Sequence, residues 1–212
     1  MKWFLKCLKN YATFNGRAGR TELWYFMLYW SIFYVVIIAF DQYTKWLIRT
    51  SPDLHRLEIF EGWLEFYYIQ NSGMAMGIDI LPTHVISMIS ITATIGIFAY
   101  LLCTLEHAGL GYLFFMGLVL GGALGNITDR LIMGYIEGYG GLLDGHVVDF
   151  IYFSLRINDW TVFPYVFNVA DMAISISIIT LLIFGKYLLP EEPPSGSKDI
   201  IEQEGAAKEQ TN

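Results

Sequence analysis

The chain contains few charged residues. Only 16% of its 212 residues are Asp, Glu, Lys or Arg, whereas a water-soluble domain usually has about a quarter. Hydrophobic residues make up 55% of the sequence and aromatic residues 17%, which excludes a disordered or low-complexity chain. Aromatic side chains are also enriched at membrane interfaces. The composition therefore favours an integral membrane protein over a cytosolic enzyme.

An excess of basic residues is also lacking. The formal net charge is -7, and residues 191–212 alone supply -4 because they hold six acidic residues and two lysines. The remainder is close to neutral, so nucleic acid is not an expected partner. Residues 188–212 are expected to form an acidic, disordered tail.

The sequence has only two cysteines and four histidines. Cys7 and Cys103 lie far apart and fit neither a disulfide framework nor a metal-ligand spacing. The histidines show no metal-binding spacing, and no serine lies in a nucleophile motif. We therefore expect neither a metal nor a cofactor.

Four apolar runs are long enough to cross a membrane as helices, and they cover residues 23–40, 81–105, 108–128 and 163–185. Four spans place both termini on the same side of the membrane. That side carries eight Lys and Arg residues against five on the other, so both termini are expected in the cytoplasm. Residues 1–22 would then form a basic cytoplasmic extension.

Two longer segments, 41–80 and 129–162, fall on the far side of the membrane in this arrangement. Between Glu58 and Ile69 apolar and polar residues partly alternate, which predicts short strands at the outer interface. The expected fold is therefore mainly α, with four transmembrane helices and a small β-rich segment on the outer face.

Acidic residues near the span ends are candidates for function, because a carboxylate inside a membrane span is costly. Asp171 lies three residues after Asn168, and Asp129 lies three residues after Asn126. This spacing puts each pair on one helical face. The alternative is that these side chains only cap helix ends or bond to nearby backbone.

Asp149 lies between large apolar residues, so desolvation should raise its pKa. If Asp149 and Asp171 meet, repulsion between them favours one shared proton. One carboxylate could then activate water while the other acid protonates the carbonyl or the leaving amine. This is the chemistry of an aspartyl protease. Asp129 is expected to stay ionised and structural.

Other features have simpler explanations. Asp41 and Lys45 have the spacing of a helical ion pair. The glycines at 117, 121 and 125 allow another helix to approach closely. Residues 71–77, which are rich in small residues, read as a flexible loop.

Five segments taken together resemble lipoprotein signal peptidase, also called signal peptidase II, in the family's order and at the expected span ends. They are residues 41–45 (DQYTK), 71–75 (NSGMA), 121–130 (GGALGNITDR), 147–150 (VVDF) and 167–171 (FNVAD). The resemblance covers roughly residues 24 to 187. It implies a four-helix bacterial inner-membrane aspartyl endopeptidase that removes signal peptides from prolipoproteins, just before a diacylglyceryl-modified cysteine.

The resemblance also implies roles for individual residues. It places the catalytic pair on Asp149 and Asp171, at the periplasmic face. Substrate-binding or supporting positions fall on Asp41, Lys45, Asn71, Gly73, Asn126, Asp129, Arg130 and Asn168. The implied partners are lipid-modified prolipoproteins and membrane lipid, the protein is expected to act as a monomer, and the cyclic peptide globomycin is expected to inhibit it.

Three segments depart from the family pattern. Met76 stands where the family usually has an aromatic residue, and 19 residues separate Asp129 from Asp149, a longer stretch than expected. This glycine-containing insert would be either a lid over the cleft or a longer surface loop. Residues 14–24 resemble the opening of a different family of small membrane proteins, so the N-terminal extension has no assigned role.

A proton-coupled transporter or channel subunit is the rival interpretation, because intramembrane Asp and Asn residues also build ion paths. Four spans are few for a transporter. The carboxylates gather at one interface instead of the midplane, and no inverted repeat is visible, which disfavours transport.

Overall fold

The computed structural model describes residues 20–73, 81–104, 108–158 and 160–189. Four long helices dominate it: α2 (Arg20–Thr50), α3 (Thr83–Thr104), α4 (Leu110–Ile136) and α5 (Val169–Leu188). All four are long and apolar enough to cross a membrane, α2 through its segment Ser31–Thr50. The described chain is thus mainly helical with four candidate membrane spans, as the sequence predicts.

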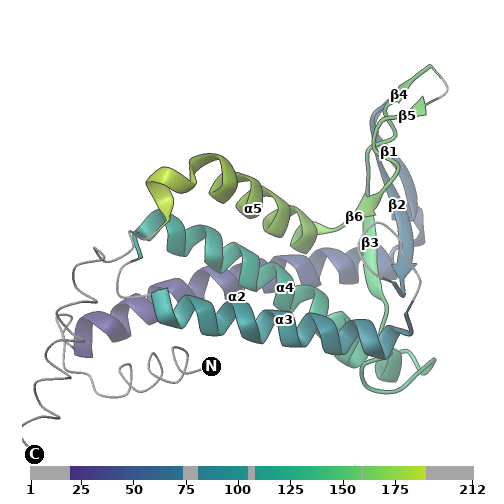
Figure 1. Cartoon of the computed structure of the whole chain (residues 1–212). Helices are drawn as coiled ribbons and strands as arrows, with labels where there is room; N and C mark the ends of the chain where they lie inside the picture. The colour runs from purple at the N-terminus through teal and green to yellow at the C-terminus, as the bar shows by residue number, and fades with distance from the viewer. Residues whose placement is uncertain (1–19, 74–80, 105–107, 159, 190–212) are drawn as a thin grey trace, which may run out of the picture.

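Helix α4 is the central helix and packs against the other three (Figure 1). Its glycines make close approach possible, as predicted. A Cβ added at Gly121 would lie 3.1 Å from the backbone oxygen of Tyr34 on α2, and one added at Gly122 would lie 2.5 Å from the backbone oxygen of Ala170 on α5. Side chains at these positions would therefore push the helices apart.

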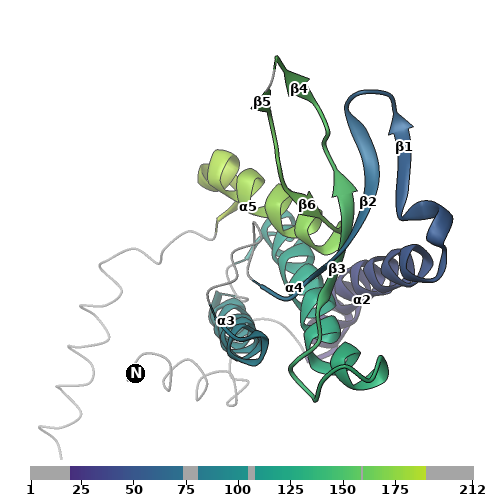
Figure 2. The same cartoon turned by 90° about the vertical axis from the view of Figure 1, so that its right-hand side faces the viewer.

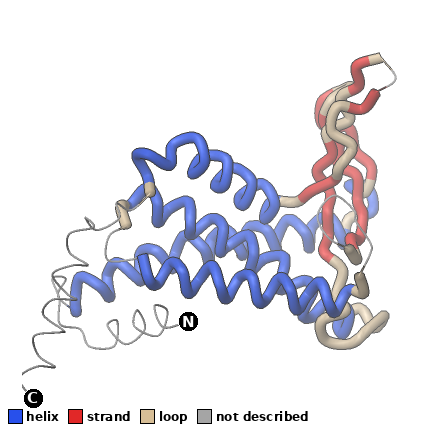
Figure 3. The backbone as a smooth tube through the Cα atoms, viewed as in Figure 1, coloured by secondary structure: helices blue, strands red, loops and turns tan. Residues whose placement is uncertain are grey.

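A four-stranded antiparallel sheet lies at one end of the bundle and runs across the helix direction (Figures 1 and 3). Its order is β1 (Arg56–Phe60), β2 (Leu64–Asn71), β3 (Val147–Tyr152) and β6 (Val166–Phe167), and the short 3-10 helix η1 (Pro52–Leu54) leads into it. A separate hairpin of β4 (Arg156–Ile157) and β5 (Trp160–Thr161) projects from it beside the β1–β2 hairpin (Figure 2). The strands expected between Glu58 and Ile69 are present, while β3 was not predicted.

Three helix ends differ by more than three residues from those expected. Helix α2 continues ten residues beyond Phe40, and α4 continues beyond Thr128 to Ile136. In these extensions Lys45 forms ion pairs with Asp41 and Asp129, and Arg130 donates to the Gly73 carbonyl, so the charged side chains have partners inside the protein and do not interrupt the helices. Helix α5 begins at Val169 instead of residue 163, because the segment before it pairs with β3 as strand β6 and Asn168 caps the helix.

The first residues of the insert continue α4 to Ile136, and the part that follows folds back on the helix. The backbone N–H groups of Leu143 and Gly145 donate to the carbonyls of Leu131 and Arg130, and Ser87 Oγ of α3 donates to Leu143 O at 2.7 Å. A Cβ at Gly145 would collide with the Asp129 carbonyl. The insert is therefore a surface loop fastened to α3 and α4. Residues 1–19 of the basic extension, Met76, residues 105–107 and residues 190–212 of the acidic tail lie outside the described residues.

Candidate active site

Strand β3 turns Asp149 away from the packed face of the sheet. Val148 and Phe150 point to the opposite face, where they form a cluster with Ile48 of α2. Asp149 pairs across the ladder with Ile69, so Asn71, two residues along β2, is its diagonal neighbour on the same face. Asn71 Nδ2 donates to Asp149 Oδ2 at 2.9 Å, and the carboxylate is only 2% exposed.

Asn168 and Asp171 form a reciprocal cap at the start of α5. Asn168 Oδ1 accepts from the Asp171 backbone N–H at 2.9 Å, and Asp171 Oδ2 accepts from the Asn168 backbone N–H at 3.2 Å. The capping alternative is therefore present in the structure, and Asn168 precedes the helix instead of sharing a helical face with Asp171. The cap leaves the Asn168 side-chain amide nitrogen free to bond elsewhere.

Through this nitrogen and the cap, Asn168 joins the two proposed catalytic residues. The nitrogen donates to Asp149 Oδ1 at 2.7 Å, while Asp171 is held on the other side of Asn168 by the cap. Burial, followed by the charge of Asp171, raises the pKa of Asp149 to about 7, although hydrogen bonds from Asn71 and Asn168 and the charge of Lys45 act in the opposite direction. Near neutral pH Asp149 can thus keep a proton while it lies beside Asp171.

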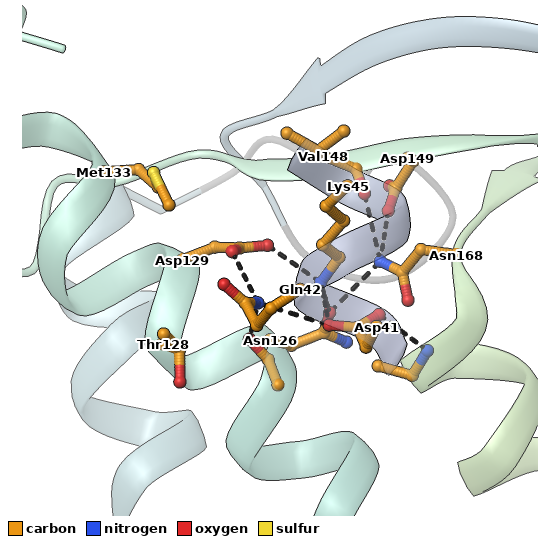
Figure 4. Close-up of polar contacts among 12 residues, drawn as sticks. Asp41, Gln42, Lys45, Asn126, Thr128, Asp129, Met133, Val148, Asp149 and Asn168 are labelled. Carbon is orange, nitrogen blue, oxygen red and sulfur yellow. Dashed lines mark hydrogen bonds and ion pairs between the residues drawn. The ribbon is translucent and has the colours of Figure 1, made fainter. Parts of the chain in front are cut away.

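A buried ion cluster supports the site from below (Figure 4). Lys45 Nζ lies 2.8 Å from Asp41 Oδ2 and 2.8 Å from Asp129 Oδ2, and all three residues are at most 1% exposed. Asp41 Oδ1 also accepts from the backbone N–H of Ala170, in the first turn of α5, where a negative charge is favourable. The cluster therefore connects α2, α4 and α5.

Gln42 is a contributor that the sequence analysis did not single out. Its Nε2 donates to Asp129 Oδ1 at 2.9 Å and to Gly125 O at 3.1 Å. Gln42 follows Asp41 in the motif at 41–45, but its spacing gave no sign that it would reach α4. The role of Gln42 could have been predicted only if the contact between α2 and α4 had been known.

Arg130 connects the site to the loop after β2. Its Nη2 donates to the Gly73 carbonyl at 2.8 Å, and the Gly73 N–H donates to Asn71 Oδ1 at 3.0 Å. Among the described residues, Arg130 Nε has no hydrogen-bond partner although it is buried. The guanidinium also interacts electrostatically with Asp149 and Asp171.

The structure brings all ten site residues named from the sequence into one continuous network of hydrogen bonds and ion pairs. They are Asp41, Lys45, Asn71, Gly73, Asn126, Asp129, Arg130, Asp149, Asn168 and Asp171. Within the described parts of the chain, no three His, Cys, Asp or Glu side chains are grouped to hold a metal ion.

An apolar cleft of about 480 Å³ opens beside Asp171. The sheet side contributes aromatic walls, with Phe153 stacked on Trp63 and packed against Phe167. Helix α5 supplies the other wall through Met172, Ser175 and Ile176. None of these lining residues comes from the insert between Asp129 and Asp149. The cleft can take an apolar group and bring a polar bond next to Asp171.

Comparison with known proteins gives a consistent result. The family model described as signal peptidase (SPase) II matches residues 33–186. The lipoprotein signal peptidase of Pelodictyon phaeoclathratiforme is 32% identical over 172 residues, covering 78% of this chain and 95% of that protein. The lipoprotein signal peptidase of Porphyromonas gingivalis is 30% identical over 198 residues, covering 74% of this chain and 87% of the relative.

Solved structures show the same fold. Two structures of bacterial membrane enzymes match at 28% and 27% sequence identity, with TM-scores of 0.55 and 0.56. The first match covers 76% of this chain and 93% of the solved one, and the second covers 72% and 88%. With the family model spanning most of the described chain, these matches show that the protein belongs to the signal peptidase II family.

Proposed function

We propose that this protein is a lipoprotein signal peptidase of the bacterial inner membrane, and that Asp149 and Asp171 are its catalytic pair. The observation that carries the proposal is that Asn168 forms hydrogen bonds with both carboxyl groups, and that an apolar cleft lies beside Asp171. A peptide bond held between them could be attacked by one activated water molecule, with no cofactor. The relatives named above act on lipoproteins, and this substrate class suits the cleft.

In the proposed reaction Asp149 holds the proton in the resting site, because its pKa of about 7 and its 2% exposure both favour the neutral acid. Asp171 lies at the edge of the cleft and is less buried. Its carboxylate would take a proton from water as the water oxygen attacks the carbonyl carbon. Asp149 would give its proton to the carbonyl oxygen, forming a neutral tetrahedral diol.

The diol then collapses and the carbon–nitrogen bond breaks. The proton now on Asp171 goes to the leaving amine, and the proton of one hydroxyl returns to Asp149, so the site regains its starting charge. The products are the signal peptide, with a new carboxyl group, and a lipoprotein, with a new amino group. The reaction is a hydrolysis with no change of oxidation state, so no oxidant is required.

The apolar cleft supports the choice of substrate. Its aromatic walls and the lipid-facing side of α5 offer an environment for a signal helix or acyl chains, which can stay among apolar groups while the bond to be cut reaches the polar network. We propose that the sheet lies on the outer face of the membrane, that both termini are cytoplasmic and that the protein acts as a monomer. We also expect globomycin to inhibit this protein.

The test is maturation of a lipidated precursor in a strain that lacks its own enzyme. Wild type should process the precursor, while Asp149→Asn and Asp171→Asn should leave it uncleaved at normal protein levels. Asp53→Asn, the same change at an exposed residue of η1, is the matched control and should behave as wild type. Retained processing in either site variant would refute the proposed pair, and equal processing of an unlipidated precursor would refute the substrate.

A further inference from the structure

Lys45 is a buried charge to which the proposed reaction gives no role. It is 1% exposed, and its ammonium has three N–H donors. Two of them face the carboxylates of Asp41 and Asp129, at 2.8 Å each. Lys45 also donates to Asn126 Oδ1 at 2.9 Å, so it contacts a residue outside its ion pairs (Figure 4).

The contact with Lys45 fixes which way the Asn126 amide points. Asn126 Oδ1 accepts from Lys45 Nζ and from Asn168 Nδ2, at 2.9 and 3.1 Å. Its Nδ2 donates to Asp171 Oδ1 at 2.8 Å. A flipped amide would set its NH2 group against an ammonium and another NH2, and its oxygen against a carboxylate. Only the observed orientation satisfies every group.

The same amide links the two proposed catalytic residues. Asn126 bonds directly to Asp171, and through Asn168 Nδ2 it is connected to Asp149 Oδ1. The charged and titratable groups around Lys45 are Asp41 on its own helix, Asp129 on α4 and, through its charge, Asp149 on β3. An oriented amide between the two side chains holds Asp171 and, through Asn168, Asp149 in a fixed relative position.

We infer that Lys45 is a positioning residue for peptide cleavage: it acts through Asn126, whose oriented amide bridges Asp171 and the Asn168–Asp149 pair. The inference rests on the proposed catalytic pair. The alternative is a purely structural role, in which Lys45 only neutralises Asp41 and Asp129 and thereby keeps α2 and α4 together. A purely structural lysine would affect the amount of folded protein, whereas a positioning lysine affects the rate constant of the folded enzyme.

A double-mutant cycle on purified protein separates these roles. Lys45→Met and Asn126→Ala should each lower kcat for a lipidated precursor by roughly 10- to 100-fold, with KM nearly unchanged, because the carboxylates are misplaced. The variant carrying both changes should be no slower than Asn126→Ala alone. Multiplication of the two effects would show that Lys45 does not act through Asn126 and would overturn the inference. Lys186→Met, the same change at an exposed residue of α5, is the control and should match wild type.

Lys45→Met leaves Asp41 and Asp129 buried without a counter-charge, which could prevent folding. The second variant, Lys45→Met with Asp129→Asn, keeps the sum of charges in this cluster at -1 while it removes the donor to Asn126. This protein should fold and show the same loss of kcat. Wild-type kcat in it would overturn the inference. Cleavage by Asp149→Asn would instead refute the catalytic pair, so the two failures are distinguishable.

Discussion

The Asn168 side chain donates a 2.7 Å hydrogen bond to Asp149, a residue 19 positions earlier in the chain. Asn168 is the N-cap of α5 and Asp149 is in β3, an inner strand of the sheet, so the bond joins the helical bundle to the sheet. The oxygen of the same side chain caps the helix at Asp171. Two functions of one amide, capping and holding a carboxylate, can therefore be separated by substitution.

Asn168→Ser and Asn168→Ala should separate them. Serine can still cap α5 but is too short to replace the amide donor to Asp149, so its free energy of unfolding should stay close to that of wild type while kcat falls by roughly 100-fold. Alanine should lose both functions and about 1 kcal/mol of stability as well. Unfolding in detergent and cleavage kinetics measure the two effects. Full activity of Asn168→Ser would show that the amide donor is dispensable.

The raised pKa of Asp149 predicts a dependence of activity on pH. The proposed mechanism needs the neutral acid, so kcat should decline as the pH rises through about 7, where Asp149 loses its proton. A pH–kcat profile of the purified enzyme measures this decline. A rate that stays constant from pH 6 to 9 would be incompatible with Asp149 as the proton donor.

The raised pKa of Asp149 should also make the free energy of unfolding depend on pH. An unfolded Asp has its ordinary pKa near 4, while folded Asp149 keeps its proton up to about pH 7. Between these values the folded state binds more protons, so Asp149 lowers the free energy of unfolding by up to about 1.4 kcal/mol per unit of rising pH. The decrease ends above pH 7. The difference between wild type and Asp149→Asn isolates it, and a difference that grows in the opposite direction would contradict the assignment.

Close packing around the ion cluster predicts a strong effect of one methyl group. A Cβ at Gly125 would lie 2.6 Å from Asp41 Oδ2, so Gly125→Ala should displace this carboxylate from Lys45 and lower stability by about 1–3 kcal/mol. The control is Gly96→Ala on α3, where a Cβ meets no atom within 4 Å among those described. Thermal unfolding of both variants tests this. Equal stability of the two proteins would mean that Asp41 can move without cost.

Much of the fold could be predicted because it depends on local composition. The four apolar runs mark the four helices, and the alternation between Glu58 and Ile69 marks β1 and β2. The helix ends were harder to place. Asp41 and Lys45 look like the end of a span in the sequence, but they lie inside α2 because Asp129, 84 residues after Lys45, completes their charge pairing.

Contacts within the site were also hard to predict, because they join residues that are far apart in the sequence. The sequence places Asp149 among apolar residues, and its burial agrees with that pattern. The partnership of Asp149 with Asn71 depends on the β2–β3 register, which no local spacing reveals. Gln42 was missed for a related reason, since its side chain reaches Asp129 only when α2 and α4 lie side by side.

The cleft beside Asp171 predicts where substrate affinity can be changed. Ser175→Trp places a large side chain in the wall of the cleft and should raise KM for a lipidated precursor by roughly 10-fold or more, with a smaller effect on kcat. Ile179→Trp lies one turn further along α5, outside the lining, and should leave KM unchanged. Equal KM values for both variants would place the substrate elsewhere.

Cooperation between Asp149 and Asp171 is tested most directly by kcat values of purified Asp149→Asn, Asp171→Asn and the variant with both changes, all confirmed to be folded. If the two carboxylates act on one water, each single change removes the reaction almost completely, and the double change adds little further loss. The contrary result is a single variant that keeps a rate within about tenfold of wild type, or two losses that multiply, because independent groups would then carry the cleavage.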